Sequence, residues 1–445
     1  MCVVAHLRSR NRHFVDAAVD VLRLAPWLTR ERVLRWGWAF TVLSLVLLAW
    51  DVATHMTDGV TNAAGEHLGR DFINFWSGAR LAESGNAALA YDVEAFLQYQ
   101  KTLVGPASEF KLYSYPPVTM LLSWPLAALP YLAGLVAWTL LGIGLVAWLL
   151  SRLVGWQMAA IAAIGAPAAY LNILAGQNGH FTAALLVGGL SLLDRRPVLA
   201  GILLGLMAYK PQMGVLLPVA LAAGGRWRSF AAAALIVIGL IVASFVLIGG
   251  EAWSGFLDQM KLQTRMMELA PDSWYRMQTV FIMARMFGAG LPAAYAAQAC
   301  SAVLALLAVA VVWRTRSALE LKAATLVVAM FLATPYDQDY DMVVLPFVAA
   351  WLARDALVGG DFRAWEKTVL CLLLAQPIMT MLLSHLVGGQ VAPVVLWLTL
   401  ALLLRRALAA DVDRLADPAL TSADLVGLKG GTSRRAQAAV TSLLS

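Results

Sequence analysis

Polar residues interrupt the apolar sequence of this chain at five places, and their types suit proton transfer and anion binding. Two are the single residues Asp71 and Lys210, and three are the segments 177–180, 275–279 and 337–341. A carboxylate can take a proton as a general base, and a lysine can hold a phosphate as a point charge. Polar groups at membrane depth are costly and usually functional, so these clusters are the candidates for a site.

Asp71 has two interpretations that the sequence leaves open. The apolar positions 72, 75, 76 and 79 follow helical spacing, and Gly85 and Asn86 end the pattern, which predicts a short helix beginning beside Asp71. An aspartate at that position is a good N-cap, and capping alone would explain it. The same position would also hold a carboxylate at the membrane edge, ready to act on a substrate.

The other polar clusters have structural alternatives as well. A turn around residue 178 explains its glycines and asparagine, but Gln177 and His180 are less expected there. Lys210 either snorkels to the interface or holds a phosphate. The aspartates between residues 337 and 341 suit either a solvated helix end or a hard cation, although the chain has no compact calcium-type loop.

Ordinary soluble-enzyme chemistry is not indicated by any motif. The chain has no glycine-rich phosphate loop, no zinc-ligand spacing and no nucleophile elbow. We therefore predict no cofactor and no metal site, and leave the metal requirement of any reaction open.

The elements that must position these residues are membrane helices. Of the 445 residues, 60% are hydrophobic and 13% are charged, whereas soluble proteins carry about 25% charged residues. Apolar runs such as 132–150 and 230–248 approach the roughly 20 residues that cross a bilayer. These observations predict an all-α integral membrane protein, a multi-pass protein of the cell membrane.

The basic residues indicate which ends of the helices lie in the cytoplasm. The net charge is +6, and arginines gather at the amino end and in short loops between apolar runs. This is the pattern of cytoplasmic retention, and it argues against a nucleic-acid partner. We therefore place the basic segment 1–35 and a flexible tail, 408–445, in the cytoplasm, with a membrane domain at 36–407 between them.

Threading the chain through the membrane predicts about 12 crossings with outer loops at about 54–115 and 249–291. Residues 118–129 are too short to cross and are expected to form a half-helix or a re-entrant segment. Residues 198–223 form either one crossing or two short helices meeting at Lys210, and we prefer the second because a lysine followed by proline suits a bend. All five polar clusters then fall on the outer face.

In the first outer loop, the helix after Asp71 and a second one capped by Asp92 are expected to be amphipathic and to lie along the membrane surface.

These residues resemble a known family. The pattern Asp-Phe-x-x-Phe-Trp-x-x-Ala-Arg at 71–80 is similar to the first periplasmic loop of glycosyltransferase family 87. The resemblance extends, over about residues 35–405, to Tyr115-Pro116-Pro117, Gly176-Gln177-Asn178, Tyr209-Lys210-Pro211, the segment 274–285 and Ala333-Thr334-Pro335-Tyr336. The chain departs from the family pattern at two segments, 277–279 and 337–341. In the second segment, Asp337-Gln338-Asp339 stands in place of a histidine-containing stretch. The resemblance therefore does not identify the sugar.

The resemblance implies a GT-C fold and transfer of a hexose, often mannose, from a polyprenyl-phosphate carrier. The acceptor would be a glycolipid or glycan on the periplasmic face of the inner membrane, and the lipid-linked sugar would be a co-substrate. Asp71 would be the base that deprotonates the acceptor hydroxyl, with inversion at the anomeric carbon. The residues expected to bind the donor and its phosphate are Lys210, Arg276, Arg285, Gln177 and His180. Those expected at the acceptor or sugar are Tyr115, Gln278, Asp337, Asp339 and Asp341.

Two other classes of function are alternatives to an enzyme. A transporter or flippase for a lipid-linked or small polar substrate would show internal repeats and polar residues at mid-membrane. The chain has no convincing repeat, and its polar residues are expected on one face. A structural partner in an envelope complex would leave those outer-face residues unexplained, so an enzyme at the membrane interface is favoured.

Overall fold

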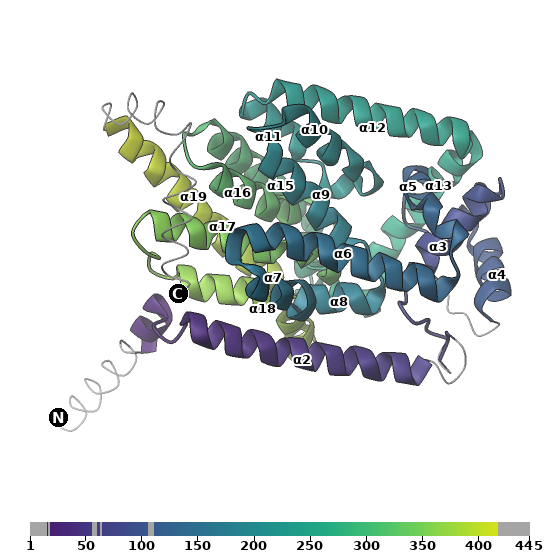
Figure 1. Ribbon diagram of the computed structural model, residues 1–445, viewed down its shortest axis with the longest axis horizontal. Helices are drawn as coiled ribbons and strands as arrows, with labels where there is room; N and C mark the ends of the chain where they lie inside the picture. Colours follow the sequence, from purple (N-terminus) through teal and green to yellow (C-terminus); the bar gives the residue numbers. More distant parts are fainter. Residues whose placement is uncertain (1–15, 17, 56–59, 63–64, 106–110, 417–445) are drawn as a thin grey trace.

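The computed structural model describes residues 16, 18–55, 60–62, 65–105 and 111–416, and these residues form a helical bundle (Figure 1). Apart from an isolated β-bridge between Thr61 and His67, they contain no extended pairing. Six helices are long and apolar enough to cross a membrane: α2 (Arg30–His55), α6 (Tyr131–Val154), α12 (Trp227–Leu247), α15 (Leu291–Arg314), α18 (Glu366–Val387) and α19 (Ala392–Ala416). The prediction of an all-α membrane protein is confirmed at this level.

A seventh candidate span is broken by a proline. Helices α7 (Trp156–Gly165) and α8 (Pro167–Ala175) meet at an angle of 54°. Ala166 between them is extended, because a residue that precedes proline is disfavoured in the helical region. The remaining apolar helices are shorter, so the predicted total of 12 crossings stays a prediction. They are α9 (Gly179–Leu192), α10 (Pro197–Gly205), α11 (Leu217–Ala223), α16 (Leu319–Ala333) and α17 (Leu345–Val358).

The predicted bend at Lys210 is present. Two short 3-10 helices, η4 (Leu206–Tyr209) and η5 (Pro211–Met213), flank this lysine, whose backbone is not helical (φ −135°, ψ 68°). The break follows from Pro211, which disfavours a helical residue before it and lacks an N–H for helix bonding. Residues 118–129 likewise form only short pieces, α5 (Pro117–Ser123) and η3 (Trp124–Ala128), as expected for a segment too short to cross.

One end of the bundle carries a cap made from both predicted outer loops. The first loop contributes α3 (Phe72–Glu83), η2 (Ala87–Tyr91) and α4 (Val93–Val104); the second contributes α13 (Gly250–Leu269), η6 (Pro271–Arg276) and α14 (Val280–Met286). Figure 1 shows α3, α4, α5 and α13 together at the right-hand end. The two loops pack tightly, since a Cβ added at Gly255 of α13 would lie 2.8 Å from Cβ of Tyr91.

The prediction that both helices of the first loop lie along the membrane surface is wrong for α3. Ten of its twelve residues are buried, on all sides of the helix. It contacts α5, η3, η2 and α6, so the cap of the bundle encloses it. The helix α4 is amphipathic as expected, with Phe96 and Gln100 buried, and the Asp92 side chain caps it by accepting a hydrogen bond from the Ala95 N–H (2.9 Å).

The core of the bundle is centred on α16. Residues 323–332 of this helix are all buried, and α15, α17 and α19 contact it. The helix α19 continues to Ala416, beyond residue 407, the predicted end of the membrane domain. Residues 417–445 of the predicted tail, and residues 1–15 of the basic segment, lie outside the described residues.

Candidate active site

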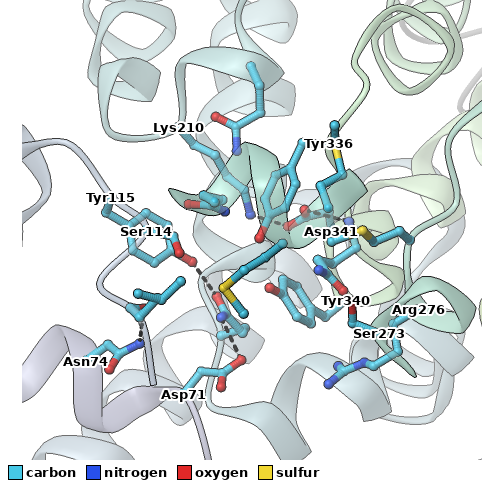
Figure 2. Close-up of a pocket in the computed structure, with 18 of the residues that line it drawn as sticks. Asp71, Asn74, Ser114, Tyr115, Lys210, Ser273, Arg276, Tyr336, Tyr340 and Asp341 are labelled. Atoms are coloured by element: carbon cyan, nitrogen blue, oxygen red, sulfur yellow. Dashed lines mark hydrogen bonds and ion pairs between the residues drawn. The ribbon is translucent and has the colours of Figure 1, made fainter. Parts of the chain in front are cut away.

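A cavity of about 280 Å³ lies where the cap meets the bundle (Figure 2). Each of the five polar clusters contributes at least one residue to it. The members of the five clusters that line the cavity are Asp71, Gln177, Lys210, Arg276, Met277, Gln338, Tyr340 and Asp341. Tyr115 and Lys111 line it from the end of the first outer loop, and Gln263, Met266 and Met267 line it from α13.

The Asp71 carboxylate does not cap the helix that follows it. The residue occupies the N-cap position of α3, but its side chain accepts no cap hydrogen bond. Its Oδ2 instead accepts from Nε2 of Gln177 (2.9 Å), and its Oδ1 lies 3.7 Å from Nζ of Lys111. The capping interpretation of Asp71 is therefore wrong, and the carboxylate faces the cavity with one oxygen held and the other beside a cation.

The turn that carries Gln177 is pressed against the start of α3. The Asp71 N–H donates to the Ala175 carbonyl oxygen (3.0 Å). Gly176 is left-handed (φ +59°), and a Cβ there would lie 2.5 Å from the carbonyl oxygen of Gly69 and 2.7 Å from Cβ of Phe72. Only glycine fits both the backbone conformation and the close approach, so it is what allows Gln177 to reach Asp71.

Tyr115 fixes the orientation of the Gln177 amide. A carboxylate only accepts hydrogen bonds, so the NH₂ of Gln177 must face Asp71 and its Oε1 must point away. That oxygen accepts from the Tyr115 hydroxyl at 2.8 Å. Burial, with Asp341 and Asp71 nearby, raises the pKa of Tyr115 well above its ordinary value, so the phenol stays protonated and can donate.

Two cations of the cavity are each paired with an aspartate from the 337–341 segment. Lys210, which is only 3% exposed, forms an ion pair with Asp341, and its Nζ also donates to Oδ1 of Asn178 (3.1 Å). The Arg276 guanidinium donates to both oxygens of Asp339, at 3.1 Å each. Charge-assisted pairs of this kind hold a cation in place for an anionic ligand.

The ring of Tyr340 lies close to both cations. Nζ of Lys210 is 5.5 Å from the ring centroid, and the central carbon of the Arg276 guanidinium is 5.4 Å from it. Both distances are within the range of cation–π attraction. The aromatic ring therefore joins the two cationic positions into one side of the site.

The structure places five of the predicted site residues outside the lining of this cavity. His180 is buried between the side-chain amide of Asn172 (2.6 Å) and the Ala163 carbonyl oxygen (3.0 Å). Arg285 donates to the carbonyl oxygens of Ala289 and Glu268. The others are Gln278, Asp337 and Asp339, and the last of these reaches the site through its pair with Arg276.

Gln278 and Asp337 are hydrogen-bonded to each other instead. The Gln278 N–H donates to Oδ1 of Asp337 (3.0 Å), and the Gln278 side chain donates to Thr380 and the Pro377 carbonyl oxygen of α18. Burial, with Asp341 nearby, raises the pKa of Asp337 well above its ordinary value. Asp337, Asp339 and Asp341 thus each contact a different partner. No group of three or more metal-ligand side chains occurs among the described residues.

Sequence reasoning did not single out Lys111, Tyr340 or Asn178 as site residues. Lys111 lies in the first outer loop and Tyr340 in the polar segment 337–341, yet a lysine in a loop and a tyrosine at an interface have many ordinary explanations. Asn178 follows Gln177 in a turn that its composition already explains. What distinguishes them is contact with Asp71 or Lys210, and those partners are more than 30 residues away in the chain.

A family comparison identifies the protein class. The model of glycosyltransferase family 87 matches residues 113–335, which include Tyr115, Gln177, Lys210 and Arg276 but not Asp71. No match was found among the curated proteins or the solved structures. Membership of an enzyme family decides against the transporter or flippase alternative. Because the match covers half of the chain, this protein belongs to glycosyltransferase family 87 and is a membrane glycosyltransferase.

Proposed function

We propose that this enzyme moves a hexose from a polyprenyl-phosphate donor to a lipid or glycan acceptor, with Asp71 as the general base. The observation that carries the proposal is the arrangement of Asp71, whose Oδ2 is held by Gln177 while the carboxylate lines a cavity that also contains paired cations. A base and an anion site in one small cavity are what transfer from a sugar phosphate requires.

The reaction would follow directly from these positions. Asp71 takes the proton of an acceptor hydroxyl, and the oxygen attacks the anomeric carbon as the bond from that carbon to the phosphate oxygen breaks. The polyprenyl phosphate leaves with the bonding electrons, and Lys210 and Arg276 stabilise its growing negative charge. A single displacement of this kind inverts the anomeric centre.

The size of the cavity agrees with a sugar as its occupant. Its volume of about 280 Å³ is just below the range of small-molecule sites, which span about 300–1,000 Å³. Its lining of carboxylate, amide, hydroxyl and cationic groups suits a hydroxyl-rich ligand. This lining supports a hexose and its phosphate in the cavity, with the lipid chain elsewhere.

We also propose that this site faces the periplasm. The basic residues of the predicted inner turns cluster in two other places: Arg152, Arg195 and Arg354 line a second cavity, and Arg406 pairs with Glu366 at 2.7 Å. None of these residues lines the candidate site. Arginines of short loops mark the cytoplasmic side, so the opposite end, with the site, would lie outside.

Reconstitution of the purified enzyme tests the proposal. Proteoliposomes would receive labelled mannose, glucose or galactose on decaprenyl phosphate, together with lipids extracted from the membranes of the source organism. We expect label from one of these donors to appear in a new glycolipid or glycan, with release of decaprenyl phosphate. Transfer from nucleotide sugars, with none from any polyprenyl-phosphate sugar, would refute the proposal.

A further inference from the structure

A second cavity, of about 710 Å³, takes no part in the chemistry proposed above and shares no lining residue with the candidate site. It is bounded by α6, α9, α10, α16 and α17, with the α9–α10 turn at its edge. We name it the arginine-lined cavity, after Arg152, Arg195 and Arg354. Its volume is well within the range of small-molecule sites, about 300–1,000 Å³.

The arginine-lined cavity lies about one bilayer thickness from the cap. Tyr131 begins α6 at the cap, where its hydroxyl donates to the Leu68 carbonyl oxygen (2.7 Å). With a helical rise of about 1.5 Å per residue, Arg152 lies about 30 Å further along α6, a distance equal to the hydrocarbon core. The Arg152 guanidinium lies 4.8 Å from the ring centroid of Trp148, which is 46% exposed. Arginine and tryptophan both favour the membrane–water interface, so the cavity lies at headgroup depth.

Two of the three arginines have no carboxylate to neutralise them. The acidic residues of the lining, Asp194 and Glu320, are each already paired with an arginine, at 2.6 Å and 3.9 Å. Arg152 and Arg195 make no ion pair within the described ranges of the chain. The cavity therefore has two uncompensated positive charges, which suit an anionic ligand.

The lining becomes apolar toward the interior of the membrane. On α6, Leu149 lies almost one turn closer to the cap than Arg152, and on α10, Leu203 lies about two turns beyond Arg195. Leu199, also in the lining, is 37% exposed, so the apolar part continues to the outer surface of the bundle. A ligand that covers the whole cavity must be anionic at one end and apolar at the other.

We propose that the arginine-lined cavity binds an anionic phospholipid of the cytoplasmic leaflet, with its phosphate at Arg152 and Arg195 and its acyl chains along the apolar wall. Basic pockets between membrane helices on the cytoplasmic side bind acidic lipid headgroups. A water-soluble anion would leave the apolar wall uncovered, and a zwitterionic lipid would bring a cation toward the arginines. The choice of leaflet rests on the orientation proposed above, whereas the binding itself does not.

Two neighbouring arginines of the α9–α10 turn provide a matched test. Arg195 and Arg196 are both exposed, but only Arg195 lines the cavity. Binding of phosphatidylglycerol and of phosphatidylcholine to the purified full-length enzyme would be measured by native mass spectrometry. We expect the wild type to bind phosphatidylglycerol about tenfold more tightly than phosphatidylcholine. Arg195→Gln should lower this preference about fivefold, and Arg196→Gln should leave it unchanged.

A soluble headgroup tests the apolar part of the cavity. An excess of glycerol phosphate, which has the phosphate but no acyl chains, should not displace bound phosphatidylglycerol. Displacement would overturn the assignment to a lipid and favour a soluble phosphate. Equal losses in Arg195→Gln and Arg196→Gln, or no preference of the wild type for phosphatidylglycerol, would overturn the site itself. Because no sugar is transferred in this experiment, failure of the proposed function would be seen separately, as normal lipid binding without any transfer.

Discussion

At the scale of single residues, the structure separates two roles that an aspartate before a helix can have. Asp71 occupies the capping position of α3 but makes no cap hydrogen bond, and its carboxylate is engaged by Gln177 and Lys111. Replacement of this side chain should therefore affect chemistry more than helix stability.

The Asp71→Asn variant tests this separation. Asparagine can keep an oxygen toward Gln177, so folding and donor binding should stay near those of the wild type, but it cannot take a proton. Sugar transfer should fall by about 10²–10⁴-fold, the usual contribution of a general base. The measurement is transfer rate together with melting temperature in detergent; a well-folded variant with full activity would remove Asp71 as the base.

Tyr115→Phe tests whether the orientation of Gln177 matters. Loss of the hydroxyl removes the hydrogen bond that keeps the Gln177 oxygen away from Asp71, and we expect the turnover rate to fall by about tenfold with little change in the KM for the donor. Tyr113→Phe is the matched control, because the buried Tyr113 hydroxyl has no hydrogen-bond partner among the described residues. Equal effects of the two variants would contradict a positioning role for Tyr115.

The role of Lys210 must be tested together with its partner. Lys210→Met alone leaves Asp341 buried without its cation, a change that costs about 3–5 kcal/mol in buried pairs. The double variant Lys210→Met/Asp341→Asn removes both charges and should recover most of that stability. If Lys210 binds the donor phosphate, the stable double variant should still show a raised KM for the donor, and a normal KM would contradict that role.

At the scale of elements, the site depends on turns that join helices more than on the helices themselves. The α8–α9 turn brings Gln177 to Asp71, and the break between η4 and η5 places Lys210 beside Asp341 and Asn178. Glycine and proline produce both features, by allowing a left-handed residue in the first case and by disfavouring a helical one in the second.

Gly176→Ala should damage the site through the backbone. The added Cβ would stand 2.5 Å from the Gly69 carbonyl oxygen, and the left-handed conformation is itself unfavourable for alanine. We expect a loss of about 1–3 kcal/mol in stability, together with a loss of transfer as Gln177 moves away from Asp71. Gly144→Ala in α6 is the control, because nothing lies within 4 Å of its added Cβ; equal stability and activity of both variants would argue against a tight α8–α9 turn.

At the scale of the whole molecule, the five polar clusters meet at one end and the arginines of the predicted inner turns lie elsewhere. This separation leads to a topological prediction. In a variant without native cysteines, Ser254→Cys on the exposed side of α13 should react with an impermeant thiol reagent added to intact cells. Ser191→Cys, which is also exposed but lies at the arginine-lined cavity, should react only after the membrane is opened. Labelling of Ser191→Cys in intact cells would reverse the proposed orientation.

The sequence by itself determined the class of fold, the helix that begins after Asp71, the cap at Asp92 and the bend at Lys210. These features depend on local rules, namely apolar run length, helical spacing, capping and proline geometry, and all of them can be read from neighbouring residues. The polar interruptions of the apolar sequence singled out Asp71, Gln177 and Lys210, and the family resemblance added Arg276; the structure places all four around one cavity.

Only the tertiary structure decided which polar residues share that cavity and which support the fold. His180 and Arg285 make their hydrogen bonds away from the cavity, and Asp339 accepts from Arg276 without lining it, although each of them lies within or beside a motif that reaches the site. The burial of α3 was also not predicted, because it results from enclosure by α5, η3 and α6, which lie elsewhere in the chain. Contacts between residues far apart in the chain depend on how helices pack, and that packing leaves no periodic pattern in the sequence.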